Sequence, residues 1–131
     1  MPVAARRLIA LAALLLATAT LVGALSAHVL REQLAPDRFA ILQTAVHYQF
    51  FHSLGLLAVG VRALTHGSRL LHVAGALLGT GIVLFCGSLY LLLAGVPRVF
   101  GLLTPIGGLC LIAAWLLVAA VAPRKRAAAR S

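Results

Sequence analysis

Acidic side chains are nearly absent from this chain, which has 2 Asp and Glu residues against 11 Lys and Arg residues. Both carboxylates, Glu32 and Asp37, lie between two apolar segments, in what we expect to be a solvent-facing loop. Catalysis by paired carboxylates, a carboxylate proton relay and an acidic ion site are therefore unsupported. The chain also lacks a Walker loop, a G-x-S-x-G elbow and an H-E-x-x-H motif. We predict that it is not an enzyme, and we assign no catalytic residue.

Cysteine is equally scarce. Cys86 and Cys110 lie in separate apolar segments, and neither belongs to a C-x-x-C motif. Thiols in such surroundings are most often small apolar packing residues. The sequence therefore predicts no metal site and no cofactor.

Apolar residues make up most of what remains. The hydrophobic fraction of 63% exceeds the ~45–50% apolar content of soluble domains. The mean hydropathy is +1.08. A helix of ~20 residues crosses ~30 Å of hydrocarbon. The sequence predicts an all-α bundle of four transmembrane helices, a single membrane domain over residues 1–131 with a basic, disordered tail at 123–131. The four predicted spans are residues 8–27, 39–61, 70–94 and 100–122.

The positive charge, a formal +9, is distributed between the apolar segments and forms no basic face with interleaved aromatic residues. This pattern argues against a nucleic-acid partner and predicts membrane lipids as the surroundings. Cytoplasmic loops of membrane proteins carry the excess of Lys and Arg. We therefore expect a multi-pass protein of the bacterial inner membrane with both termini in the cytoplasm. The residues expected on the cytoplasmic side are Arg6, Arg7, Arg62, Arg69, Arg124, Lys125, Arg126 and Arg130, against Arg31, Arg38 and Arg98 outside.

The N-terminus admits a second interpretation. Arg6 and Arg7, the apolar run and the sequence Ala24-Leu25-Ser26 resemble a secretory signal with its small-residue cleavage site. The apolar run of about 20 residues is longer than the ~7–15 of a signal peptide, however. We expect a retained first helix, and cleavage would leave three spans.

Polar side chains in the second apolar segment are the best indication of a site. The sequence His47-Tyr48-Gln49-Phe50-Phe51-His52 places hydrogen-bonding groups where lipid is expected. At 100° per residue, His47 falls on the apolar side with Gln43, whereas Tyr48, Gln49 and His52 should point into the bundle. Polar residues of the other helices should meet them in the outer half of the bundle. The predicted polar pocket comprises His28, Thr44, Tyr48, Gln49, His52, Ser88, Tyr90 and Thr104.

Three interpretations of this cluster remain open. Polar groups inside a bundle commonly hydrogen-bond one another and fix helix packing, which describes a structural or accessory protein. If the cluster is instead a pocket for a small solute, ion, proton or lipid headgroup, the protein is a transporter or binder whose ligand the sequence does not identify. Ligation of haem or a metal by His28 and His52 is the weaker alternative, because no thiol or carboxylate completes the ligand set.

Glycines in the last two apolar segments predict close helix packing. Gly75 and Gly79 form a G-x-x-x-G spacing, which lets two helix backbones approach each other. We expect packing within the monomer, and a homo-oligomer formed through the same two glycines is the alternative. The predicted packing residues are Gly75, Gly79, Gly87, Gly107 and Gly108.

Four stretches in order resemble one family, the YgdD-like small membrane proteins (domain of unknown function 423), which is related to transmembrane protein 256. The stretches are GALSAHVL at 23–30, QTAVHYQFFHSLGLL at 43–57, FCGSLYLL at 85–92 and TPIGGLCLIAAW at 104–115. The resemblance implies a four-helix bacterial inner-membrane protein without an assigned activity. The chain departs from the family pattern at Ser26, His47 and Cys86, none of which belongs to the predicted pocket.

Overall fold

The computed structural model describes residues 2–123, most of which lie in four long helices. The first, α1 (Pro2–Leu25), continues through a π-helical segment, η1 (Ser26–Leu30), into the short α2 (Arg31–Gln33). After α3 (Pro36–Thr65) and α4 (Arg69–Leu93), a 3-10 turn, η2 (Arg98–Leu102), leads into α5 (Leu103–Ala120). The predicted all-α bundle of four long helices is confirmed.

The helix bounds differ from those of the apolar segments from which the helices were predicted: α5 lies within its segment, 100–122, whereas α1 and α3 begin before theirs. The second long helix begins at Pro36 and ends at Thr65, whereas its apolar segment covers 39–61. A charged residue interrupts an apolar run without interrupting backbone hydrogen bonding, and proline suits the first position of a helix. The predicted disordered tail, apart from Pro123, lies outside the described residues.

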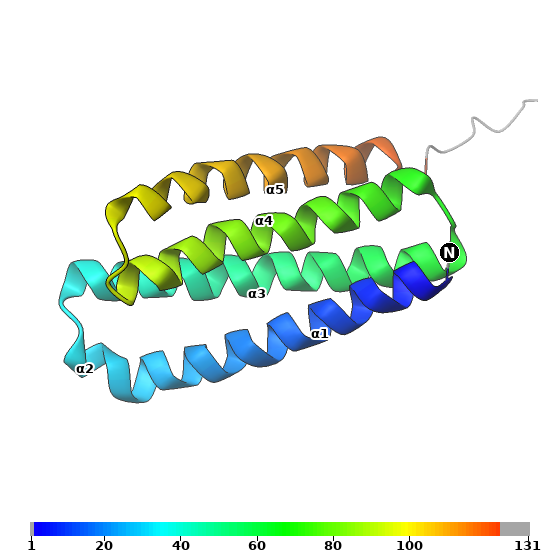
Figure 1. Ribbon diagram of the computed structural model, residues 1–131. Helices are drawn as coiled ribbons and strands as arrows, with labels where there is room; N and C mark the ends of the chain where they lie inside the picture. The colour runs from blue at the N-terminus through cyan, green and yellow to red at the C-terminus, as the bar shows by residue number, and fades with distance from the viewer. Residues whose placement is uncertain (1, 124–131) are drawn as a thin grey trace, which may run out of the picture.

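Consecutive long helices run antiparallel and pack side by side, α1 on α3, α3 on α4 and α4 on α5 (Figure 1). The helix α4 also contacts α1. By contrast, α5 packs on neither α1 nor α3 along its backbone within the described part of the chain. The bundle is therefore open, and α3 and α5 border a groove over α4.

Glycines bring α4 and α5 together. A Cβ on Gly107 would overlap the backbone of Phe85, and a Cβ on Gly81 would lie 2.7 Å from Leu111. Such contacts are possible only without side chains at these positions. At the C-terminal end of α4, Arg38 of α3 donates a hydrogen bond to the carbonyl of Leu93, where a cation suits the end of a helix.

The other predicted packing glycines differ in their surroundings. Leu8 and Leu11 of α1 lie against Gly75 and Gly79, so the G-x-x-x-G spacing contacts another helix of the same chain. The prediction for Gly87 is wrong, because no atom lies within 4 Å of a Cβ there. Gly108 makes only ordinary contact, since the nearest atom, in the ring of Phe85, lies 3.8 Å from its Cβ position.

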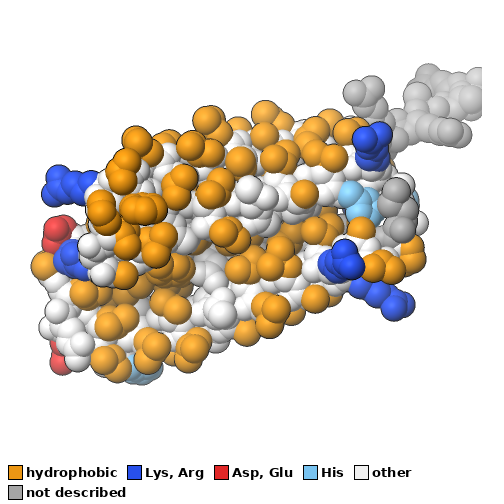
Figure 2. Space-filling view, in the orientation of Figure 1, with side chains coloured by type: hydrophobic (Ala, Val, Ile, Leu, Met, Phe, Trp, Pro, Cys, Tyr) orange, Lys and Arg blue, Asp and Glu red, His pale blue; other side chains and the backbone are white. Residues whose placement is uncertain are grey.

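The surface between the helix ends is apolar. Hydrophobic side chains cover the flank of the molecule, and basic side chains lie at both ends (Figure 2). Among residues 2–123, three helical segments are long and apolar enough to cross a membrane: Pro2–Gln33, Arg69–Leu93 and Arg98–Ala120. The helix α3 is longer than α4 but less apolar, because it carries four of the eight predicted pocket residues as well as charged residues near both of its ends. This fold is that of an integral membrane protein.

Candidate functional site

Gln49 of α3 connects three helices through one amide group. Its side chain is buried, with 4% exposed. The Nε2 group donates to the Leu15 carbonyl and to the Thr18 hydroxyl of α1, both at 2.8 Å. The Oε1 atom accepts from the hydroxyl of Tyr90 in α4, at 2.7 Å. Both N–H groups and the carbonyl oxygen of this amide are therefore satisfied inside the bundle.

Thr18 is suited to receive this bond because of its place in α1. Its hydroxyl lies 3.0 Å from the carbonyl oxygens of Leu14 and Leu15, one turn earlier in the same helix. The hydroxyl proton is directed to its own helix, which leaves a lone pair for the Nε2 group of Gln49. A threonine in an apolar helix thus becomes an acceptor for a neighbouring helix.

A second polar contact joins α4 and α5. The hydroxyl of Ser88 donates to the carbonyl of Phe85 at 2.9 Å and lies 2.6 Å from the hydroxyl of Thr104. Because the single Ser88 proton is used within α4, Thr104 donates in the interhelical bond. Ser88 is buried, with 2% exposed.

A third contact joins α3 and α5. The indole Nε1–H of Trp115 donates to Nδ1 of His52 at 3.0 Å. The neutral imidazole then carries its proton on Nε2, which makes that atom a donor. The indole reaches α3 because residue 55 is glycine: a Cβ there would lie 2.5 Å from the Trp115 ring.

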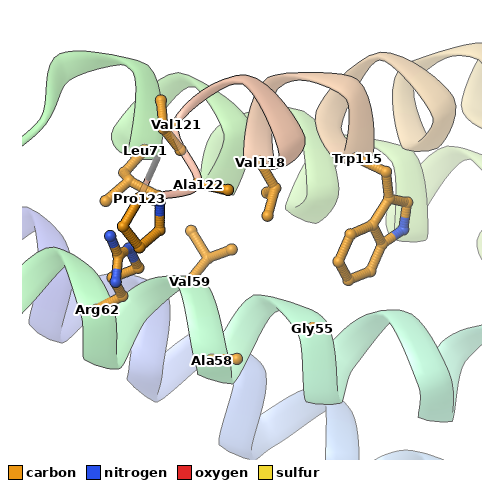
Figure 3. Close-up of a pocket in the computed structure, with 10 residues that line it drawn as sticks. All are labelled: Gly55, Ala58, Val59, Arg62, Leu71, Trp115, Val118, Val121, Ala122 and Pro123. Carbon is orange, nitrogen blue, oxygen red and sulfur yellow. The ribbon is translucent and has the colours of Figure 1, made fainter. Parts of the chain in front are cut away.

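Trp115 divides the groove between α3 and α5 into two cavities. The first, which we call the aromatic cavity, measures about 450 Å³ and is lined by Tyr48, Phe51, His52, Phe85, Gly108, Leu111, Ile112 and Trp115. Within it, Tyr48 stacks on Phe85 with ring centroids 4.5 Å apart, and the His52 ring lies 5.4 Å from that of Tyr48. The second, the Arg62 cavity, measures about 240 Å³. Figure 3 shows this second cavity between the ribbons of α3 and α5, with Arg62 at one end and Trp115 at the other.

The structure does not bring the eight predicted pocket residues together in one pocket. Gln49 bonds Tyr90, and Ser88 bonds Thr104, as two separate pairs. Tyr48 and His52 line the aromatic cavity instead. The remaining two residues, His28 and Thr44, are exposed, and Thr44 bonds only the Ala40 carbonyl of its own helix.

The reason is that three helices border different sides of α3. Gln49 faces α1 and α4, whereas Tyr48, rotated by 100° from it, lies on the groove side and remains 41% exposed. Thr44 lies one turn from Tyr48, on a side that α5 does not cover. His28 lies in η1, near the level at which α3 begins, whereas His52 is about 24 Å along α3 from Pro36 at 1.5 Å per residue.

Sequence reasoning missed three residues that the site uses: Thr18, Phe85 and Trp115. Thr18 stands out as a hydroxyl within an apolar segment, and Trp115 is the single tryptophan of the chain. Neither signal identifies the partner residue. Within residues 2–123, no group of three or more His, Cys, Asp or Glu side chains is placed to hold a metal ion.

Comparison with known proteins identifies relatives for most of this structure. A family model described as "Protein of unknown function (DUF423)" matches residues 22–108. The UPF0382 membrane protein SH2409 of Staphylococcus haemolyticus is 43% identical over 98 residues, which cover 73% of this chain and 78% of the relative. The UPF0382 inner membrane protein YgdD of Escherichia coli K12 is 35% identical over 96 residues, 73% of each chain. The chain belongs to the DUF423 family.

The resemblance inferred from four sequence stretches is thereby confirmed. The DUF423 match includes Gln49, Tyr90, Ser88 and Thr104, and it ends before Trp115. Thr18 also lies outside the matched residues. No solved structure is detectably similar to the chain.

Proposed function

We propose that this DUF423 protein is a structural or accessory protein of the bacterial inner membrane and not an enzyme, and that its polar side chains hold the bundle together. The observation that supports this proposal best is the Gln49 amide, which bonds α1 and α4 simultaneously. Hydrogen bonds between helices in lipid stabilise association by roughly 0.6 kcal/mol on average and by up to about 1.7 kcal/mol. The name of the E. coli relative, an inner membrane protein, supports the location.

Variants of Gln49 and His52 test this role. Gln49→Ala should lower the yield of folded protein, because it leaves the Tyr90 hydroxyl without its acceptor. His52→Ala should do so less, because it removes one hydrogen bond at the groove. Folded yield is compared with complementation of a deletion strain. A variant that folds fully but fails to complement would contradict a purely structural role and indicate a binding site.

We further propose four spans with both termini in the cytoplasm. The length of α3, 30 residues, supports a full crossing, since about 20 are sufficient. Antiparallel packing then alternates the direction of the four helices, and the end with fewer carboxylates carries Arg6, Arg7, Arg62 and Arg69. Such an excess of basic residues is typical of the cytoplasmic side.

Fusions at the connections between helices test this topology. A cytoplasmic reporter after residue 67 and after Ser131 should be active, and a reporter after residue 35 or 96 should be inactive. An active periplasmic reporter after Ser131, with residue 2 in the cytoplasm, would overturn the four-span arrangement, because it requires an odd number of spans. The same result with an extracellular residue 2 would indicate an inverted bundle.

The aromatic cavity supports a second candidate, a binder of a small lipid-soluble molecule. Nδ1 of His52 is occupied by Trp115, so Nε2–H is left as a donor with no hydrogen-bond partner among residues 2–123. A donor near the middle of a membrane span is costly unless it is satisfied. A ligand with an acceptor oxygen and a flat apolar body would satisfy it between the surrounding rings.

Extraction of the purified protein tests this second candidate. Organic extracts of wild type and of His52→Phe are compared by mass spectrometry, with His47→Phe as the control because His47 lies outside the cavity. A compound that accompanies wild type and His47→Phe in stoichiometric amount, but not His52→Phe, supports a ligand. Identical extracts from all three proteins would exclude a tightly held one.

A further inference from the structure

The Arg62 cavity is an apolar slot with one charge at its end. It is lined by Gly55, Ala58, Val59, Arg62, Leu71, Trp115, Val118, Val121, Ala122 and Pro123. Figure 3 shows the guanidinium of Arg62 beside Pro123 at one end and the indole of Trp115 at the other, with Val59 and Val118 between them. Every lining side chain except Arg62 is apolar apart from the indole N–H, which is bonded to His52.

The slot exists because α3 and α5 both pack on α4, while their own backbones stay apart and the Trp115 side chain bridges between them. Two of the four residues that α3 contributes to the lining, Gly55 and Ala58, are small and leave space unfilled. The groove is open along its side, which faces hydrocarbon when the bundle spans a membrane. Apolar surface of this kind is covered by lipid chains, because an empty void loses the dispersion contacts of its lining.

No Asp or Glu side chain lies near Arg62, the charged residue at the end of the slot. Arg62 lies in the last turn of α3, about 38 Å along the helix from Asp37 in its first turn. Glu32, the other carboxylate, lies in α2 at that same far end. An arginine at the membrane surface binds phosphate through paired N–H groups. Arg6, Arg7 and Arg69 at the same end add to the attraction for anionic lipid.

We infer that the Arg62 cavity is a binding site for one anionic phospholipid. The phosphate contacts Arg62, and one acyl chain follows the slot toward the indole of Trp115, which closes it. The distance along α3 from Arg62 to Gly55 is about 10 Å, so the slot holds the first part of the chain. This inference requires only that the Arg62 end lies at a membrane surface, and it is independent of which leaflet that is and of the role proposed for Gln49.

The single tryptophan provides the measurement. Bromine atoms on a lipid chain quench indole fluorescence on contact, and Trp115 is the only tryptophan in the chain. The full-length protein is placed in phosphatidylcholine nanodiscs containing a small fraction of chain-brominated phosphatidylglycerol or, in a parallel series, chain-brominated phosphatidylcholine. We expect brominated phosphatidylglycerol to quench several-fold more than its mole fraction predicts, and brominated phosphatidylcholine to quench in proportion to its mole fraction.

Two variants with one matched control identify the site. Arg62→Gln should reduce the quenching by phosphatidylglycerol to the level of phosphatidylcholine. Arg69→Gln removes the same charge at the same end, but Arg69 does not line the slot, so the preference should persist. Ala58→Phe keeps all charges and fills the slot, so it should abolish the excess quenching while circular dichroism stays unchanged.

Three results would overturn the inference. Equal quenching of wild type by the two lipids would show that no anionic lipid is selected. Equal losses in Arg62→Gln and Arg69→Gln would show general attraction to the basic end of the molecule. Undiminished excess quenching in folded Ala58→Phe would show that the chain does not enter the slot, and this variant remains informative if Arg62→Gln fails to fold.

Discussion

One amide side chain determines much of the internal polarity of this bundle. In a soluble protein, a buried glutamine competes with water for its hydrogen bonds, whereas in lipid its only partners are other protein groups. Gln49 finds three of them, from α1 and α4. This satisfaction explains why a strongly polar residue is tolerated in the least exposed part of α3.

Replacement of Gln49 by leucine should destabilise the bundle. The variant loses three hydrogen bonds and leaves the Tyr90 hydroxyl without its acceptor, so we expect a cost of about 1–3 kcal/mol. Unfolding in mixed micelles of increasing SDS fraction measures the difference. Gln43→Leu is the control, because Gln43 is exposed on the same helix. A Gln49→Leu protein as stable as this control would contradict a stabilising role.

Gly55 is the second residue whose replacement should have a specific effect on the structure. Leucine at this position would displace the Trp115 indole from α3 and break its bond to His52. We expect a cost of about 1–3 kcal/mol from overpacking, with a shift of tryptophan emission. Gly87→Leu provides the comparison, since its Cβ would meet no atom within 4 Å. Unchanged emission in Gly55→Leu would show that the indole does not depend on this contact.

At the scale of the element, α4 is the helix that contacts all three of the other long helices. It contacts α1, α3 and α5, and glycines allow the closest of these approaches. Leu8 of α1 lies against Gly75, and Leu111 of α5 lies against Gly81. Close packing at small residues thus provides attraction between the helices, since the hydrophobic effect provides little of it in lipid.

The contact between α4 and α5 predicts different responses at two adjacent glycines. Gly107→Ala would place a methyl group on the backbone of Phe85, so α5 must move away from α4 and stability should fall by about 1–3 kcal/mol. Gly108→Ala adds the same methyl at ordinary contact distance, and it should be neutral or slightly stabilising, since alanine favours helix. The midpoints of SDS unfolding distinguish the two. Equal midpoints would mean that the close approach at Gly107 is absent in the membrane.

The whole molecule combines three strongly apolar helical segments with one that is less apolar. The segments that contain α1, α4 and α5 qualify as membrane spans by composition, whereas α3 depends on neighbours to satisfy its polar groups. The open arrangement, with α5 attached through α4, leaves the groove that Trp115 crosses. Polar contacts thus join α3 to each of the other three long helices.

An insertion assay should detect this dependence. In a carrier protein that reports translocation, residues 36–65 alone should insert less efficiently than residues 69–93 alone, because a lone segment exposes Gln49 and His52 to lipid. Residues 2–65 should restore insertion of α3, since α1 supplies two acceptors for Gln49. Gln49→Leu in the isolated segment should have a similar effect. Full insertion of unmodified residues 36–65 would refute the dependence.

The fold could be predicted from the sequence because it depends on long apolar runs. Four segments of sufficient length leave few alternatives to a helical bundle, and short connections imply antiparallel neighbours. The prediction of the helix ends was less accurate, as α3 shows. Hydropathy indicates where charged residues begin, whereas a helix ends where its backbone hydrogen bonding stops.

The site could be predicted only in part. Helical periodicity correctly separates His47 from Gln49, but it does not state which helix covers each side of α3. Tyr48 was therefore grouped with Gln49, although it lies on the groove that α5 leaves open. The contact of Trp115 with His52 depends on the distance between α3 and α5, which is set by the packing of both helices on α4 and which no local pattern encodes.

The order of the Gln49 partners along the chain has a consequence for synthesis. Thr18 and Leu15 leave the ribosome before Gln49, whereas Tyr90 follows much later. The amide nitrogen can thus be satisfied as soon as α3 meets α1, while the amide oxygen waits for most of α4. If the ribosome pauses within α4, α1 and α3 form a hairpin in which only the amide nitrogen of Gln49 is hydrogen-bonded. Completion of α4 then adds the bond from Tyr90. Biogenesis of this protein is therefore expected to proceed in two steps, in which Gln49 bonds first to α1 and then to α4.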